Sequence, residues 1–162
     1  MKVYDYYKDL PPLAKGIVVV GVLGFTAAIG INVWNRLKSP GADAKATNQA
    51  INALKQKYKP SFRDDQYLTM ADEIYSSMDQ AVGDDYGKVQ DILKRMKNDL
   101  DVALLIKAYG SRQLHNFMVP KQSQGLFAAV QGELGQEWGG LTSYRVTDIN
   151  ADWKKKGISY QI

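Results

Sequence analysis

Two glutamates one helical turn apart are the pair of residues in this chain most suggestive of catalysis. Glu133 and Glu137 stand in the segment GELGQEWGG, where Trp138 follows directly. Paired carboxylates beside aromatic rings are the groups that cleave glycosidic bonds in many hydrolases. Glutamates at this spacing are also frequent on solvated helix faces, and no second element of a glycan-cleaving site is recognisable. A membrane-anchored cell-wall glycan hydrolase therefore stands as an alternative function.

The other titratable residues exclude several kinds of site. The chain has no cysteine, which excludes disulfides, thiolate metal sites and a cysteine nucleophile. Its single histidine, His115, is expected to be a partly buried, hydrogen-bonded side chain. No glycine-rich phosphate loop is present, and Lys154, Lys155 and Lys156 are typical of a solvated charge run. We predict no catalytic, cofactor-binding or metal-binding residues, no enzyme activity, no small-molecule substrate and no nucleic-acid partner.

Among the secondary-structure elements that the sequence predicts, the most distinctive is one long segment without charged residues. Residues 17–34 read IVVVGVLGFTAAIGINVW, and as a helix they would rise about 27 Å. That length approaches the hydrocarbon thickness of a bilayer, about 30 Å. We therefore predict a transmembrane helix over residues 17–34, in a chain of 162 residues whose overall mean hydropathy is −0.33.

The side chains of this stretch have two expected roles. Those expected to form the membrane anchor are Ile17, Val18, Val19, Val20, Gly21, Val22, Leu23, Gly24, Phe25, Ile29, Ile31, Val33 and Trp34. Small residues spaced four apart let two membrane helices approach closely. Gly24, Ala28 and Gly30 are the expected positions of such a contact, and self-association of the chain is one form that it would take.

The flanks favour an uncleaved anchor over a secretory signal peptide. The apolar run exceeds the usual length of about 7–15 residues in such signals, and the small-residue segment Ala42-Asp43-Ala44 lies well beyond its end. Tyrosines precede the run and Trp34 ends it, as in the aromatic belts of membrane helices. Arg36, Lys38 and Lys45 follow closely and are expected to contact lipid headgroups. Further basic residues up to Arg63 favour a C-terminal domain on the cytoplasmic side.

The remainder of the chain has helical periodicity up to residue 136. Apolar residues recur at helical spacing in each of several segments. The expected inward-facing positions are Ile51, Leu54 and Tyr58; Leu68, Ala71, Ile74, Met78 and Val82; Val89, Ile92, Leu93, Met96 and Leu100; and Leu126, Phe127, Val130 and Leu134. Thr47 and either Asp64 or Asp65 are candidate helix caps. Leu100–Tyr109 reads as a buried helix that Asn98-Asp99 separates from the preceding one and that Gly110-Ser111 ends, and Gln113–Met118 reads as a short helix.

The last part of the chain has a different composition. Aromatic residues and glycines alternate in residues 137–162, and Ser143–Val146 and Ile158–Ile162 are predicted to be short extended segments. They would either fold back on the helices or pair with another subunit. The predicted organisation is an N-terminal flank (1–16), a transmembrane helix (17–34), a basic linker (35–46), a helical domain (47–136) and an extended aromatic and basic tail (137–162). The fold class is mainly α.

Residues 68–134 resemble a single annexin repeat. The segments that carry the likeness are IYSSM (74–78), GDD (83–85), ILKRMKND (92–99) and LIKAYGSRQL (105–114). The resemblance implies a compact bundle of short helices and, in that family, calcium-mediated contact with phospholipid. The calcium motif is not matched, because the family pattern needs a later carboxylate and residues 121–126 contain no acid. A tethered, annexin-like lipid-binding module is the other alternative function.

The favoured function is structural. The combination of an anchor with a small helical domain predicts a non-enzymatic, single-pass protein that joins a lipid bilayer to the protein partners of a larger assembly. A membrane-containing phage particle and a bacterial envelope complex are the expected contexts, with the virion membrane or the bacterial inner membrane as the location.

Overall fold

The computed structural model describes residues 44–79, 85–114, 123–135 and 144–162, with the side chains of 44–47 left out. These residues form six helices and one pair of very short strands. The helices are α3 (Ala44–Lys55), α4 (Asp64–Met78), α5 (Tyr86–Lys94), α6 (Asp99–Tyr109), α7 (Leu126–Leu134) and α8 (Tyr144–Lys155). Strands β1 (Ser111–Arg112) and β2 (Gln124–Gly125) pair antiparallel, with Ser111 opposite Gly125. The prediction of a mainly helical domain is confirmed.

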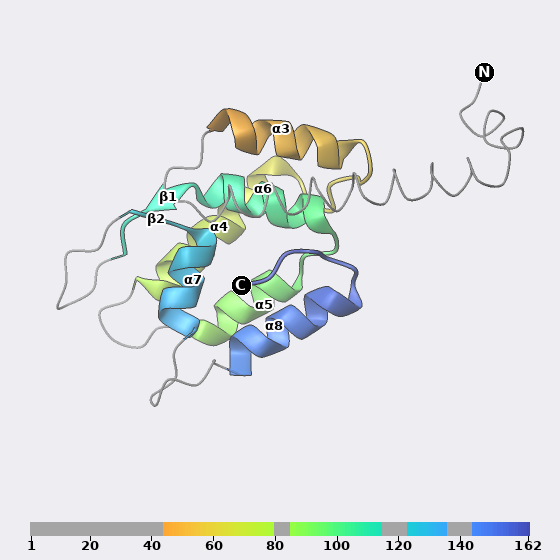
Figure 1. Cartoon of the computed structure of the whole chain (residues 1–162). Helices are drawn as coiled ribbons and strands as arrows, with labels where there is room; N and C mark the ends of the chain where they lie inside the picture. Colours follow the sequence, from red (N-terminus) through yellow and green to blue (C-terminus); the bar gives the residue numbers. More distant parts are fainter. Residues whose placement is uncertain (1–43, 80–84, 115–122, 136–143) are drawn as a thin grey trace, which may run out of the picture.

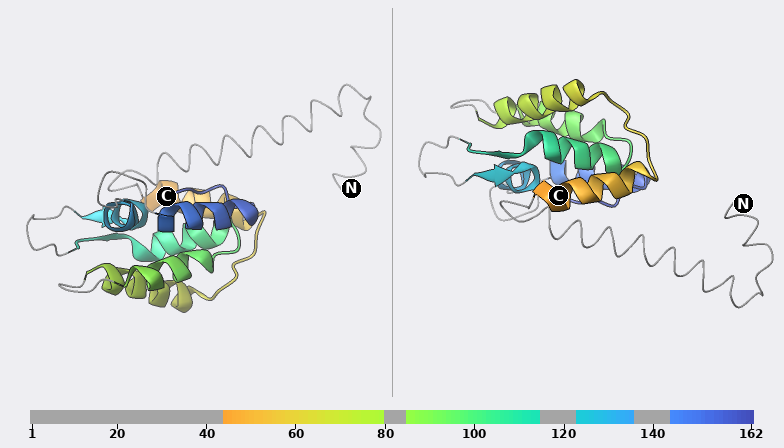
Figure 2. Two further views of the ribbon diagram at one scale, coloured as in Figure 1. Left: turned by 90° about the horizontal axis from the view of Figure 1, so that it is seen from below. Right: turned by 90° about the horizontal axis from the view of Figure 1, so that it is seen from above.

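Helix α6 lies at the centre of the bundle (Figure 1). It packs against α3 and α4, while α5 packs against α4 and α8, and α7 contacts both α6 and α8. The views in Figure 2 show the same arrangement from above and below, with α3 and α4 on different sides of α6. Nearly all of α6 is buried, including Leu100, Val102 and Leu105, which explains why its sequence shows little amphipathic pattern.

Helix boundaries follow local capping chemistry. Asp85 accepts a hydrogen bond from the Lys88 backbone N–H at the start of α5, and Asn98 accepts one from the Asp101 N–H at the start of α6. Helix α6 ends at Gly110, whose φ of 63° lies in a region that L side chains rarely adopt. The buried helix predicted to end at Tyr109 does end there, and α5 starts directly after Asp85.

Most of the predicted inward-facing residues are buried, but Leu68 is not. Val89, Ile92 and Leu93 on α5, and Leu126, Phe127, Val130 and Leu134 on α7, all belong to one core, as predicted. Met96 and Leu100 are buried too, but α5 ends at Lys94, so the predicted single helix face is divided between α5 and α6. On α4 the core positions are Tyr67, Met70, Ala71, Ile74 and Met78, whereas Leu68 is 53% exposed. The predicted positions Ala71, Ile74 and Met78 are buried, and only the first turn differs: Tyr67 faces inward and donates its hydroxyl to Asp101 at 2.6 Å. Val82 lies outside the described residues.

Two predicted caps and one predicted helix differ from the structure. Helix α3 begins at Ala44, so Thr47 lies inside the helix and not at its start, and residues 44–46 of the predicted linker are helical. The cap position of α4 is Arg63, whose backbone N–H donates to the Gln66 side chain at 2.9 Å. Asp64 and Asp65 occupy the first turn, where the helix dipole favours acids. Of the predicted helix Gln113–Met118 only Gln113 and Leu114 are described, and these two residues, which follow strand β1, are not helical.

The prediction of an extended segment at Ser143–Val146 is wrong from Tyr144 onward, because this region begins helix α8. Val146, Ile149 and Trp153 recur at helical spacing and are all buried. Residues 158–162 form neither helix nor strand. They fold back on the bundle, where Ile158 and Tyr160 are buried and Asn150 exchanges two hydrogen bonds with the Ile162 backbone.

Candidate functional site

The residues predicted to contact the membrane lie mostly outside the described part of the chain. This holds for all anchor positions from Ile17 to Trp34, for the helix-contact positions Gly24, Ala28 and Gly30, and for Arg36 and Lys38. Lys45 lies in the first turn of α3. Over the described ranges, none of the helices combines the length and the apolar character that crossing a membrane requires.

Of the two glutamates predicted as a possible catalytic pair, only Glu133 lies within the described residues. Glu133 lies near the end of α7, where the Tyr86 hydroxyl donates to Glu133 Oε2 at 3.5 Å. Glu137 and His115 lie outside the described residues. The arrangement needed for glycoside cleavage, two carboxyl groups at a defined separation, stays a prediction. Among residues 44–79, 85–114, 123–135 and 144–162, no cluster of three or more acids or histidines is placed to hold a metal ion.

Asp101 is the most deeply buried acid among the described residues, with no exposed surface. Its Oδ1 accepts from the Ser61 N–H at 2.9 Å and from the Tyr67 hydroxyl at 2.6 Å, and its Oδ2 accepts from the Lys97 N–H at 3.0 Å. Burial and the hydrogen bond to Asp101 raise the pKa of Tyr67. The carboxylate therefore ties the α3–α4 connection and α4 to the start of α6, which is a structural role.

A second polar cluster surrounds Arg112. Its guanidinium lies over the rings of Tyr75 and Tyr109, with 5.3 and 5.1 Å from Cζ to the ring centroids. It donates to the Tyr109 carbonyl at 2.9 Å and to Asp72 Oδ1 at 2.7 Å. Burial raises the pKa of Tyr109 to about 12, so its hydroxyl is protonated near pH 7. The cluster links α4, α6 and β1.

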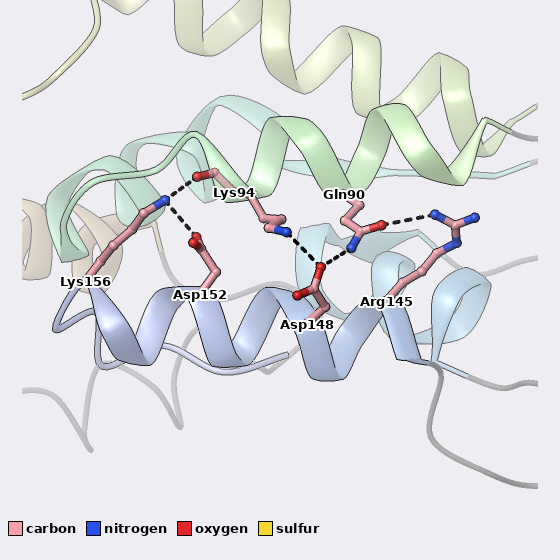
Figure 3. Close-up of polar contacts among 6 residues, drawn as sticks. All are labelled: Gln90, Lys94, Arg145, Asp148, Asp152 and Lys156. Atoms are coloured by element: carbon pink, nitrogen blue, oxygen red, sulfur yellow. Dashed lines mark hydrogen bonds and ion pairs between the residues drawn. The ribbon is translucent and has the colours of Figure 1, made fainter.

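A third polar cluster joins α5 to α8 (Figure 3). Asp148 accepts from Gln90 at 2.6 Å and from Lys94 at 2.7 Å, and Gln90 accepts from Arg145 at 3.0 Å. The hydrogen bond from Lys94 lowers the pKa of Asp148. At the end of α8, Lys156 bonds both Asp152 and the Lys94 carbonyl. Each polar side chain of this cluster faces a partner on the opposing helix or on its own, so the cluster fastens α8 to α5.

Sequence reasoning did not single out Asp101, Arg112 or Asp148. The signal nearest to Asp101 was Asn98-Asp99, which marked the start of a helix but did not show which acid is buried. Tyr67, Arg112 and Asp148 form hydrogen bonds with residues 34 to 58 positions away in the chain. Periodicity in the sequence does not indicate contacts between residues so far apart.

Comparison with protein-family models, with curated proteins and with solved structures finds no match. The resemblance to an annexin repeat thus remains a prediction from residues 68–134. The three polar clusters are shown by their contacts to join secondary-structure elements of the bundle.

Proposed function

We propose that this chain is a single-pass, membrane-anchored structural protein that links a bilayer to a larger protein assembly. The single observation that carries the proposal is the uncharged stretch at residues 17–34, bracketed by aromatic residues and followed by Arg36 and Lys38. In a membrane-containing phage particle or a bacterial envelope complex, such a chain would hold one folded domain close to the lipid surface.

The described domain supports the proposal because it is a compact body with a firmly attached C-terminal end. Trp153 is fully buried and its indole N–H donates to the Leu93 carbonyl at 2.9 Å. Ser159 donates its backbone N–H to Asp99 at 2.6 Å. These contacts fasten residues 153–159 to helix α5 and to the start of α6, as expected of a domain that serves as a rigid attachment point.

The surface also carries large apolar side chains of the kind found in protein contacts. Leu68 on α4 is 53% exposed and Tyr144 on α8 is 60% exposed. Isolated exposed apolar residues are common, so each is a starting point for mapping contacts with a partner. Substitution of either residue should weaken assembly without altering insertion into the membrane.

Membrane insertion is tested with the full chain expressed in bacteria. The wild type should stay in the membrane pellet after alkaline carbonate extraction. The variant Val22→Arg with Phe25→Arg should be released, because each arginine at the centre of a span costs about 2.5–3.5 kcal/mol. Leu68→Arg is the matched control, because it places the same side chain on an exposed position of α4. Release of the wild type would refute the anchor.

The structural role is tested separately by mild detergent extraction from the native source. The chain should elute in a complex larger than its own mass of 18.1 kDa, together with other proteins or further copies of itself. A free monomer that brings no other protein with it would refute the linking role while leaving the anchor intact.

A further inference from the structure

We propose that one end of the helical domain is a docking surface for anionic phospholipid, an inference that rests on the proposed function. The helix α3 ends there, and so do α5 and α8, while α6 begins there (Figures 1 and 2). We call this surface the basic end and define it by six exposed cations: Lys55, Lys57, Lys59, Arg95, Lys97 and Lys154.

Hydrogen bonds bring these segments together although they are far apart in the sequence. Asn98 Nδ2 donates to the Lys59 carbonyl at 3.4 Å, which joins the end of α3 to the start of α6. Lys156 bonds the Lys94 carbonyl, which joins the end of α8 to the end of α5. The three basic segments, 55–59, 95–97 and 154–156, thus form one neighbourhood that the sequence alone does not reveal.

The acids of this neighbourhood are largely neutralised or turned inward. Asp101 is fully buried and saturated by hydrogen bonds, and Asp99 is buried while it accepts from the Ser159 N–H. Asp65 is paired with Arg63, and Asp152 with Lys156. Asp64, in the first turn of α4, is exposed beside them. None of the six cations of the basic end forms an ion pair with a described acid, so their charge is available to an anionic partner.

Aromatic rings lie among the cations. Arg95 and Lys97 lie 5.6 and 6.0 Å from the centroid of the half-buried Phe62 ring, and Lys57 Nζ lies 4.8 Å from that of Tyr58. Cations mixed with aromatic rings suit the headgroup layer of a bilayer, which is anionic at its surface and apolar just below. Because the same chain carries the predicted membrane span, anionic lipid is the partner that these observations favour.

The chain between span and domain is long enough for this contact. Residues 35–43 reach at most about 30 Å when fully extended. Helix α3 has 12 residues and is therefore about 18 Å long. The basic end, at the far end of α3 from the span, is thus within reach of the bilayer surface.

The test uses the full chain in nanodiscs of phosphatidylcholine, with or without phosphatidylglycerol, and measures lysine acetylation rates by mass spectrometry. Lys57, Lys59 and Lys97 should react about threefold more slowly on the anionic discs, and about 0.5 M NaCl should abolish the difference. Lys107, exposed near the other end of α6, should react equally in both. Equal rates at the basic end on both discs would overturn the proposal.

Charge variants provide the matched comparison. Lys59→Glu with Lys97→Glu should remove the protection of Lys57, whereas Lys88→Glu with Lys107→Glu reverses the same number of charges elsewhere and should preserve it. Loss of protection in both variants would show a general charge effect and would overturn the assignment to this surface. Protection by a single-stranded DNA oligonucleotide but not by anionic lipid would identify a nucleic-acid surface and would also overturn it.

The outcomes separate the two proposals. Failure of the chain to enter discs of either composition counts against the membrane anchor and not against the basic end. The same chain is then added to the outside of preformed vesicles, and the same lysines are compared. Normal entry into discs without any effect of phosphatidylglycerol leaves the anchor standing and refutes the docking surface.

Discussion

At the scale of single residues, the stability of this domain depends on buried polar groups whose partners are distant in sequence. Asp101 accepts three hydrogen bonds and has no exposed surface. Removal of one partner from a buried, charged hydrogen-bond network is among the more destabilising changes known. The exposed ion pairs, such as Arg63 with Asp65, contribute little by comparison.

Asp101→Asn should lower the free energy of unfolding by about 2–4 kcal/mol. The amide would place an N–H donor opposite the Lys97 N–H, which now donates to Oδ2, and the buried donor would lose its acceptor. Urea denaturation followed by circular dichroism measures the change. Asp91→Asn, on the exposed side of α5, is the control and should change stability by less than about 0.5 kcal/mol. Equal effects of the two substitutions would contradict the role of Asp101.

Buried tyrosines predict a loss of stability at alkaline pH. Burial raises the pKa of Tyr109 from 10.0 to about 12, and it also raises the pKa values of Tyr67 and Tyr160. Above pH 10 the unfolded chain loses these protons while the folded chain keeps them, so the folded state is progressively disfavoured between about pH 10 and 12. Below pH 10 these groups give no pH dependence.

The measurement is the urea midpoint as a function of pH, combined with tyrosinate absorbance. The midpoint should fall steadily above pH 10, and Tyr109→Phe should make the fall shallower because one of the raised pKa values is removed. A midpoint that is constant up to pH 12 would rule out this linkage.

At the scale of secondary-structure elements, α8 shows how a helix can be overlooked in a polar sequence. Its buried face consists of Val146, Ile149 and Trp153, with polar residues between them. Aromatic residues and flanking glycines suggested extended structure. The three apolar positions nevertheless have helical spacing, and the polar side of the helix is stabilised by Asp148 and Lys156 against α5.

Trp153→Phe should destabilise the domain by about 2–3 kcal/mol, because it leaves a cavity and removes the hydrogen bond to the Leu93 carbonyl. Thermal and urea unfolding of the full chain in detergent measure the change. Tyr144→Phe, at the exposed start of the same helix, is the control and should be nearly neutral. A stable Trp153→Phe variant would mean that α8 contributes little to the core.

At the scale of the whole molecule, the domain and the apolar stretch make separate contributions. Among the described residues, the buried core runs from Ala50 on α3 to Tyr160. We expect a core of this size to fold without the predicted span. The anchor would set where the domain resides, and the basic end would set how it is oriented there.

A fragment of residues 44–162 should therefore keep its helical circular dichroism spectrum and unfold in one cooperative transition. Its unfolding free energy per residue should lie in the range of ordinary small domains, about 0.05–0.15 kcal/mol. The same fragment carrying Asp101→Asn should unfold at a lower urea concentration. A non-cooperative transition of the unsubstituted fragment would show that the first 43 residues help to build the core.

Local chemistry was readable from the sequence. The apolar faces of α5 and α7, the helix start at Asn98 and the stop at Gly110 follow from spacing and capping within a few residues. The uncharged stretch at residues 17–34 likewise needs no partner to be recognised. These features depend on neighbours along the chain, and that is the information a sequence contains directly.

Only the tertiary structure decided which polar groups are buried and which charges share a surface. Tyr67, and not Leu68, faces inward, where its hydroxyl bonds the carboxylate of Asp101, 34 residues later in the chain. The basic segments at 55–59, 95–97 and 154–156 become neighbours because α3, α5 and α8 all end on one side of the bundle. The physical reason is that burial and electrostatic potential depend on distances in space, which the packing of the helices creates.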